Sequence, residues 1–247
     1  MNKTVGIIGG LGPDTTAKFY LEVISSCLKK SNLRRPPMLI WNVPVPLKIE
    51  SDLLIKSKGE ERFLPLLITA AKNLEKGGAD FLVMPCNSLH LFIKETRKAV
   101  RVPVLNIIEE TVKFLKEQKV NKIGILATSI TLNKKLFNSH LEAAGIKQVI
   151  PSKTQQKIID QIIKGLVWNN PGVDSKKKIM QVISKLKKAG INNILLACTD
   201  LQLLNLRHPR IRIFDTMKIL TEATANELLG IRPNSNKTDF ANETVLN

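Results

Sequence analysis

The sequence predicts an α/β protein made of two similar halves, each a parallel sheet flanked by helices. Strand-like and helix-like apolar patterns alternate along the 247 residues, as in chains of βαβ units. The segment 122–127, KIGILA, resembles the opening 4–9, TVGIIG. Two apolar strand-like segments each end in a cysteine, and these residues, Cys86 and Cys198, are 198 − 86 = 112 positions apart.

The first half is expected to begin with a short strand that ends in glycines. Asp14 is expected to cap the following helix, whose predicted buried stripe contains Ala17, Tyr20, Leu21, Ile24, Cys27 and Leu28. Further strands are predicted at 38–43, 81–84 and 103–107, with a proline-bearing loop at 44–48. Helices are predicted at 58–76, interrupted by Pro65, at about 88–100, and from 107 to about 118.

The second half repeats this plan after residue 121. Its predicted strands are 122–127, 148–150, 194–197 and 211–214, and its helices are one that ends at Gly145, 154–167, 174–189 and 215–229. We therefore expect residues 1–112, together with about 215–230, to form one Rossmann-like half, and 113–214 to form the other. The halves are expected to be related by a pseudo-two-fold axis. The polar segment 231–247 is expected to be a flexible tail.

Composition favours a soluble, cytoplasmic protein. Apolar residues make up 43% of the chain and charged residues 24%, and no apolar run approaches the roughly 18 residues of a membrane span. The N-terminus lacks the cleavage region of a signal peptide. Three scattered cysteines do not form a disulfide framework and suit a reducing compartment.

The net charge of +17 raises the question of nucleic-acid binding. The lysines are spread over most of the predicted helices, and only 4% of residues are aromatic, so stacking platforms for bases are scarce. We interpret the charge as a solvated surface that attracts anions. The predicted partner is a small molecule, with neither nucleic acid nor membrane involved.

The matched cysteines are the strongest indication of chemistry. Each lies where a buried strand meets a predicted helix, and backbone N–H groups and the helix dipole at such a position favour a thiolate. Zinc binding lacks a second ligand at the usual spacing, a redox site lacks a C-x-x-C motif, and a hydrolase needs only one thiol. Two thiols facing each other across one cleft suit proton transfer at opposite faces of one carbon.

The segments VGIIGGLGPDTTAKFY, MPCNSLH and LLACTDLQLL resemble the signature of the aspartate/glutamate racemase family, in order over about residues 4–230. The opening GGLGPDTT is closest to the aspartate racemase and broad-specificity branch. The resemblance implies racemisation by two bases, Cys86 and Cys198, without pyridoxal phosphate, another cofactor or a metal. It also implies a homodimer.

The resemblance further implies which residues contact the substrate. These are Leu11 and Gly12 in the first loop, Thr128 in the equivalent loop of the second half, and Asn87, Ser88 and Thr199 beside the thiols. Lys48 stands in the loop where relatives often carry an arginine for the side-chain carboxylate of aspartate. A second basic residue of the family, sought near 154–168, is replaced by Val167 and Trp168.

Two further residues have open roles. His90 could orient Cys86 or cap its helix, and Asp200 could be an ordinary residue of a first helical turn or a base that tunes Cys198. We predict a racemase of aspartate or a related amino acid. Alternatives of the same fold are a hydantoin racemase or maleate isomerase, and a catalytically silent ligand-binding protein remains a further alternative.

Overall fold

The computed structural model describes residues 3–31, 35–231 and 245–246. Its first sheet has the order β2 (Met38–Asn42), β1 (Val5–Gly9), β3 (Phe81–Val83), with all strands parallel. The predicted strand at 103–107 is reduced to a single parallel bridge between Val104 and Leu82.

The second sheet repeats this order. Strands β5 (Lys147–Val149), β4 (Lys122–Leu126), β6 (Asn193–Leu196) and β7 (Arg212–Asp215) are parallel, and β8 (Val245–Leu246) adds an antiparallel edge. In both sheets the first strand of the half is central and the cysteine strand pairs beside it. The predicted fold class, two similar α/β halves, is confirmed.

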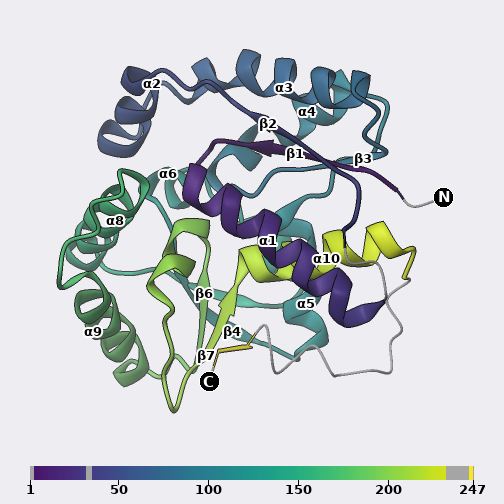
Figure 1. Ribbon diagram of the computed structural model, residues 1–247. Helices are drawn as coiled ribbons and strands as arrows, with labels where there is room; N and C mark the ends of the chain where they lie inside the picture. The colour runs from purple at the N-terminus through teal and green to yellow at the C-terminus, as the bar shows by residue number, and fades with distance from the viewer. Residues whose placement is uncertain (1–2, 32–34, 232–244, 247) are drawn as a thin grey trace.

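Three helices lie between the two sheets (Figure 1): α1 (Pro13–Lys30), α5 (Ile107–Glu117) and α10 (Thr216–Leu229). One buried cluster contains Val5, Phe19 and Ile108 from the first half together with Ile125 and Phe214 from the second. The two halves therefore share a central core.

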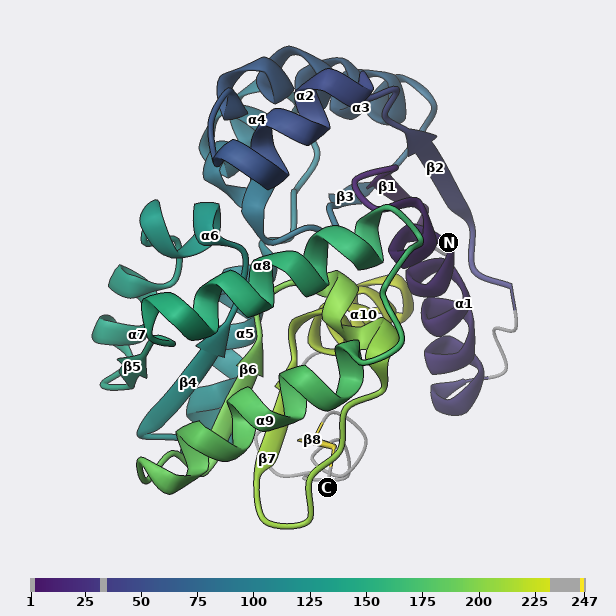
Figure 2. The ribbon, with the colours of Figure 1, turned by 90° about the vertical axis from the view of Figure 1, so that its left-hand side faces the viewer.

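The outer faces are covered separately. Helices α3 (Leu64–Lys76) and α4 (Ile93–Ala99) cover the first sheet, and α8 (Lys153–Val167) and α9 (Ser175–Lys188) cover the second (Figure 2). The remaining helices are α2 (Leu47–Ser51), α6 (Ser129–Asn133) and α7 (Asn138–Ala143). Short π- or 3₁₀-helices are η1 (Asp52–Lys56), η2 (Glu60–Phe63), η3 (Ser88–Phe92) and η4 (Thr199–Leu204).

Matching glycines in the two central strands show how closely the repeat is kept. A Cβ at Gly6 would lie 2.5 Å from Cδ2 of Leu82, and one at Gly124 would lie 2.8 Å from Cδ1 of Ile194. Leu82 and Ile194 are themselves 112 residues apart and pair with these glycines in the two sheets. Each central strand therefore needs glycine where the neighbouring strand's side chain crosses it.

The predicted stripe of α1 is wrong for four of its six residues, whereas Cys27 is buried and Ile24 is half-buried. Tyr20, Leu21 and Leu28 are 36%, 62% and 48% exposed, whereas Phe19 and Val23 are buried. The helix packs mainly on α10, and the face it buries includes Thr15, Thr16 and Ser26. Because these polar residues find hydrogen-bond partners, the buried face does not coincide with the most apolar one.

Other boundaries also differ from the sequence expectations. The N-cap of α1 is Gly12, and Asp14 lies in the first turn. Pro65 stands at the start of α3, where proline is favoured, rather than interrupting a longer helix. The expected flexible tail, 231–247, lies outside the described residues apart from Ile231 and β8. Within the described part of the chain, none of the helices combines the length and apolar character that crossing a bilayer needs.

Candidate active site

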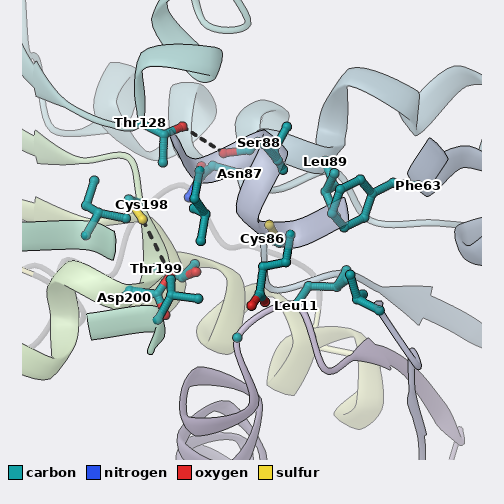
Figure 3. Close-up of a pocket in the computed structure, with 17 residues that line it drawn as sticks. Leu11, Phe63, Cys86, Asn87, Ser88, Leu89, Thr128, Cys198, Thr199 and Asp200 are labelled. Atoms are coloured by element: carbon teal, nitrogen blue, oxygen red, sulfur yellow. Dashed lines mark hydrogen bonds between the residues drawn. The ribbon is translucent and has the colours of Figure 1, made fainter. Parts of the chain in front are cut away.

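One pocket between the halves contains both matched cysteines (Figure 3). The space between its lining residues amounts to about 540 Å³, a volume that includes open solvent at the mouth. Cys86 follows β3 and Cys198 follows β6, so the carboxyl ends of equivalent strands in the two sheets supply the two thiols. Both thiols are free. The expectation that they share one cleft is met by this arrangement.

The side chain of His90 forms a hydrogen bond with the backbone of Cys86. The backbone N–H of Ile107 donates to Nε2 of the buried imidazole at 3.1 Å, so Nδ1 carries the ring proton and donates to the Cys86 carbonyl oxygen at 2.7 Å. Burial lowers the pKa of His90 to about 4, and the ring is neutral. Of the two roles left open for His90, the contacts match orientation of Cys86.

Cys198 has a carboxylate as its neighbour. Its thiol donates to Oδ2 of Asp200 at 3.5 Å, while Oδ1 of Asp200 accepts from the Thr15 hydroxyl at 3.1 Å. A Cβ at Gly12 would lie 2.8 Å from this Oδ1, so the glycine gives the carboxylate room to rest on the first loop. Asp200 from the second half therefore docks on the first half.

Ser88, which lies 112 residues before Asp200, makes the corresponding contact from the first half to the second. Oγ of Ser88 lies 2.9 Å from Oγ1 of Thr128 and 3.0 Å from Oγ1 of Thr131, both in the loop and first turn after β4. Ser88 thus contacts the first loop of the second half, as Asp200 contacts the first loop of the first half. Such reciprocal contacts are those of a pseudo-two-fold axis that passes through the pocket.

Asn87 lies in the pocket beside Cys86 and is 2% exposed. Its Nδ2 donates to Oγ1 of Thr216 at 2.9 Å, and that hydroxyl donates to the Leu196 carbonyl at 2.9 Å. Its Oδ1 is buried and has no hydrogen-bond partner. A buried acceptor without a partner costs folding free energy unless a ligand supplies the donor, so this oxygen marks a position for a donor group of a bound molecule.

Burial keeps both thiols protonated at neutral pH. Burial raises the pKa of Cys86 to about 12, although the N–H groups of Leu89 and Ser88 lower it in part. Burial, the negative charge of Asp200 and the other thiol raise the pKa of Cys198 well above its usual value. The sequence expectation that such N–H groups favour the thiolate is met for Cys86, because they lower its pKa. The N–H groups are present, but desolvation outweighs them.

Asp200 is the only buried carboxylate that contacts a cysteine within the described residues. Burial raises its pKa to about 6, while its hydrogen bonds with Thr15 and Cys198 lower it in part. It is thus ionised at neutral pH and can accept the proton of the adjacent thiol. Of the two roles left open for Asp200, this geometry matches that of a base beside Cys198.

The far end of the pocket has apolar walls. These are formed by Val45, Leu53, Leu54, Phe63, Leu89, Ile163 and Val167. The charged residues among those that line the pocket in the described part of the chain are both acidic, Glu50 and Asp200, with no lysine or arginine beside them. Lys48 is exposed on α2 and does not line the pocket.

The structure thus brings together most of the residues expected at the site. Cys86, Cys198, Leu11, Gly12, Asn87, Ser88, Thr128 and Thr199 all line the pocket, and Lys48 does not. Sequence reasoning missed the cover formed by α2 and η1, with Glu50, Leu53 and Leu54. It also missed Ile163, which is four residues before Val167 on one face of α8. Apolar spacing in 47–54 was an available signal for a helix there.

Among the described residues, the site does not contain a set of metal ligands. Over residues 3–31 and 35–231, no group of three or more histidine, cysteine, aspartate or glutamate side chains is placed to hold a metal ion. The polar groups that face the pocket are hydroxyls, an amide, two thiols and two carboxylates. They can donate and accept protons around a small organic molecule.

Comparison with solved structures shows similarity over almost the whole chain. An aspartate racemase from Picrophilus torridus superposes with a TM-score of 0.78 at 26% identity and covers 94% of this chain and 96% of that one. An aspartate racemase homologue from Pyrococcus horikoshii OT3 gives a TM-score of 0.74 at 27% identity, with 93% and 100% covered.

Comparison with characterised sequences points the same way. The broad specificity amino-acid racemase RacX of Bacillus subtilis is 28% identical over 230 residues, which are 91% of this chain and 98% of RacX. Residues 8–224 match the family model described as Asp/Glu/Hydantoin racemase. With two equivalent strands placing two thiols in one pocket, and with this match over most of its length, the chain belongs to the Asp/Glu/Hydantoin racemase family.

Proposed function

We propose that this protein is an amino-acid racemase that works without a cofactor and uses Cys86 and Cys198 at opposite faces of the substrate α-carbon. The observation that carries the proposal is the pair of thiols supplied to one pocket by equivalent strands of two sheets. A silent ligand-binding protein has no need of either thiol. The similarity to RacX supports a substrate with a free amino-acid backbone.

The protonated resting thiols require a base, and Asp200 is placed to serve. Its carboxylate takes the proton of Cys198, and the resulting thiolate removes the α-proton of the substrate. The Cys86 thiol then gives its proton to the other face of the carbanion and is left as a thiolate. The proton held by Asp200 returns through solvent to Cys86, which restores the starting state.

The carbanion must be stabilised, because the α-proton of an amino acid is much less acidic than a thiol with an unperturbed pKa of about 8.5. The hydroxyls of Ser88, Thr128 and Thr199 and the amide of Asn87 lie around the thiols. In our proposal they donate to the α-carboxylate as it takes on enolate character, and the unpartnered Oδ1 of Asn87 accepts from the α-ammonium. The apolar walls limit competing water.

The direct test is loss of the α-proton signal in D₂O, followed by NMR over a panel of L-amino acids, with the enantiomer ratio measured by chiral chromatography. We expect both exchange and racemisation for at least one member. Cys86→Ser and Cys198→Ser should each abolish racemisation while leaving the melting temperature nearly unchanged, since serine is close to isosteric. Cys27→Ser, in the core and outside the pocket, is the matched control and should racemise normally.

Near-normal racemisation by either pocket variant would overturn the two-base proposal. Adding a hydantoin and maleate to the same panel separates the rival reactions of this fold. Turnover of one of these, with no exchange of any amino acid, would replace the proposed substrate class. Absence of turnover throughout would favour a silent binding protein.

We also propose that the active form is a homodimer. Strand β2 is an edge of the first sheet and leaves Ile40 and Trp41 45% and 38% exposed, and α1 leaves Leu21 62% exposed. Large apolar side chains on a sheet edge are commonly covered by a second chain. Sedimentation analysis should give twice the mass of one chain, 27.6 kDa, and Trp41→Lys should shift the protein to monomer. A wild-type monomer at micromolar concentration would contradict this proposal.

A further inference from the structure

The far end of the pocket determines which side chain the substrate can carry. Apart from the polar residues around Cys86 and Cys198, the lining is aliphatic and aromatic, as described above, and includes Glu50 on α2. A carboxylate side chain placed there would meet no cation among the residues that line the pocket in the described segments. It would meet Glu50, and Asp200 already occupies the reacting end. Burying a carboxylate unpaired beside like charge is strongly unfavourable.

Glu50 makes a hydrogen bond across the two halves. The indole Nε1 of Trp168, the C-cap residue of α8, donates to Oε2 of Glu50 at 3.3 Å. The Trp168 ring also has a cation over its face, because Nζ of Lys164 lies 4.6 Å from the centre of the ring. Lys164 is therefore engaged with the indole and does not line the pocket. The other carboxylate oxygen of Glu50, Oε1, takes no part in this hydrogen bond.

We propose that Glu50 determines specificity and that the pocket takes amino acids with an aliphatic stem and a cationic end, such as lysine. This inference rests on the proposed racemase function and names its substrate class. The apolar walls pack against the methylene groups, while the carboxylate of Glu50 pairs with the terminal ammonium. A purely apolar side chain would pack against the same walls, but it would shield the Glu50 carboxylate from solvent while leaving it only the indole N–H of Trp168 as a hydrogen-bond partner. The aspartate expectation came from the resemblance, and Lys48, the candidate partner of the side-chain carboxylate, does not line this pocket.

The test compares three substrates that separate charge from shape. Lysine has the stem and the cation, norleucine has the same stem without the ammonium, and aspartate has the opposite charge. For the wild-type protein we expect the kcat/KM of α-proton exchange to fall in the order lysine, norleucine, aspartate. Glu50→Gln should lower the ratio of lysine to norleucine by about tenfold or more, as expected for loss of a partly buried charge pair.

Glu61→Gln is the matched control, because Glu61 is exposed and lies outside the pocket, and the variant makes the same change of charge. It should leave the lysine to norleucine ratio unchanged. Glu50→Lys should raise aspartate relative to lysine, which a merely structural role for Glu50 would not produce. The ratios are measured within each variant, so a uniform loss of folded protein does not affect them.

Two results would overturn the inference while leaving racemisation intact. One is wild-type exchange that is faster with aspartate than with lysine, and the other is an unchanged lysine to norleucine ratio in Glu50→Gln. A preference for norleucine over lysine in the wild type would assign the pocket to neutral apolar substrates instead. If none of the three substrates or the wider panel exchanges with both thiols intact, the proposed function itself has failed.

Discussion

Replacing Asp200 with asparagine should make the protein more stable at neutral pH and less active. The variant keeps an oxygen for the Thr15 hydroxyl and removes the buried charge. The pKa of Asp200 rises from 3.8 to about 6 on folding. That difference of about 2 units corresponds to about 3 kcal/mol of unfolding free energy.

The sign follows from where the proton binds more tightly. A carboxyl whose pKa is raised by folding favours the folded state below its unfolded value, near pH 4, and this contribution is lost as the pH rises through about 6. Above pH 6 the wild type buries an ionised group. Asp200→Asn should therefore match the wild type near pH 4 and exceed its unfolding free energy by up to about 3 kcal/mol at pH 8.

Activity should move in the opposite direction. Wild-type exchange should rise through about pH 6 as Asp200 loses its proton, and Asp200→Asn should lose this limb together with about 10²–10⁴ of the rate, the usual contribution of a general base. The assays are urea unfolding at pH 4 to 8 and α-proton exchange over the same range.

Asp215 provides a matched control, because burial also raises its pKa to about 6 and its Oδ1 caps α10 outside the pocket. Asp215→Asn should shift stability over the same pH window and keep the limb of the activity profile near pH 6. An Asp200→Asn variant that is less stable than the wild type at pH 8, or that retains that limb, would refute the reasoning.

Three further predictions concern residues at or away from the site. Lys48→Ala should change the kcat/KM of any amino acid by less than about twofold, since the side chain is exposed outside the pocket. A tenfold loss specific to aspartate would restore the sequence hypothesis for Lys48. Gly124→Ala should lower the free energy of unfolding by about 1–3 kcal/mol, because its Cβ would overlap Ile194 at 2.8 Å, and urea unfolding measures this. Cys27, fully buried and with a pKa raised by burial to about 11, should resist iodoacetamide at pH 8 in the folded protein, as mass spectrometry of the peptides would show.

The position of the two thiols could be predicted because it depends on topology. A short apolar run that ends at Cys86, and another that ends at Cys198, indicate buried parallel strands. In such sheets the carboxyl ends of strands meet at the binding edge, so both cysteines had to lie at an edge. Local sequence and general rules for βαβ units were enough.

The chemical state of the thiols and the identity of the pocket walls could not be predicted in the same way. A helix start changes the free energy of thiol deprotonation by up to about 2 kcal/mol, whereas the rise in the pKa of Cys86 to about 12 corresponds to about 4 kcal/mol. Burial of that size depends on the assembled pocket. Glu50 reaches the site only because α2 lies near Trp168, which is 118 residues further along the chain.

The errors in α1 have a related cause. Helical periodicity locates an apolar face, but Tyr20 and Leu21 belong to that face and are exposed in the single chain. The face that packs on α10 contains Ser26, which donates to Glu222 at 2.7 Å. A buried polar residue with a partner from a distant helix is indistinguishable, in one sequence, from a solvated residue.

The layer of α1, α5 and α10 between the sheets sets the smallest piece of this chain that can fold. Cutting the chain near residue 121 would leave α1 and α5 with the first sheet and α10 with the second, and it would expose on each fragment apolar side chains that the shared cluster buries. The two fragments would then have to associate before these apolar side chains could be buried. Unfolding should accordingly be a single cooperative transition, in which the two sheets are lost together.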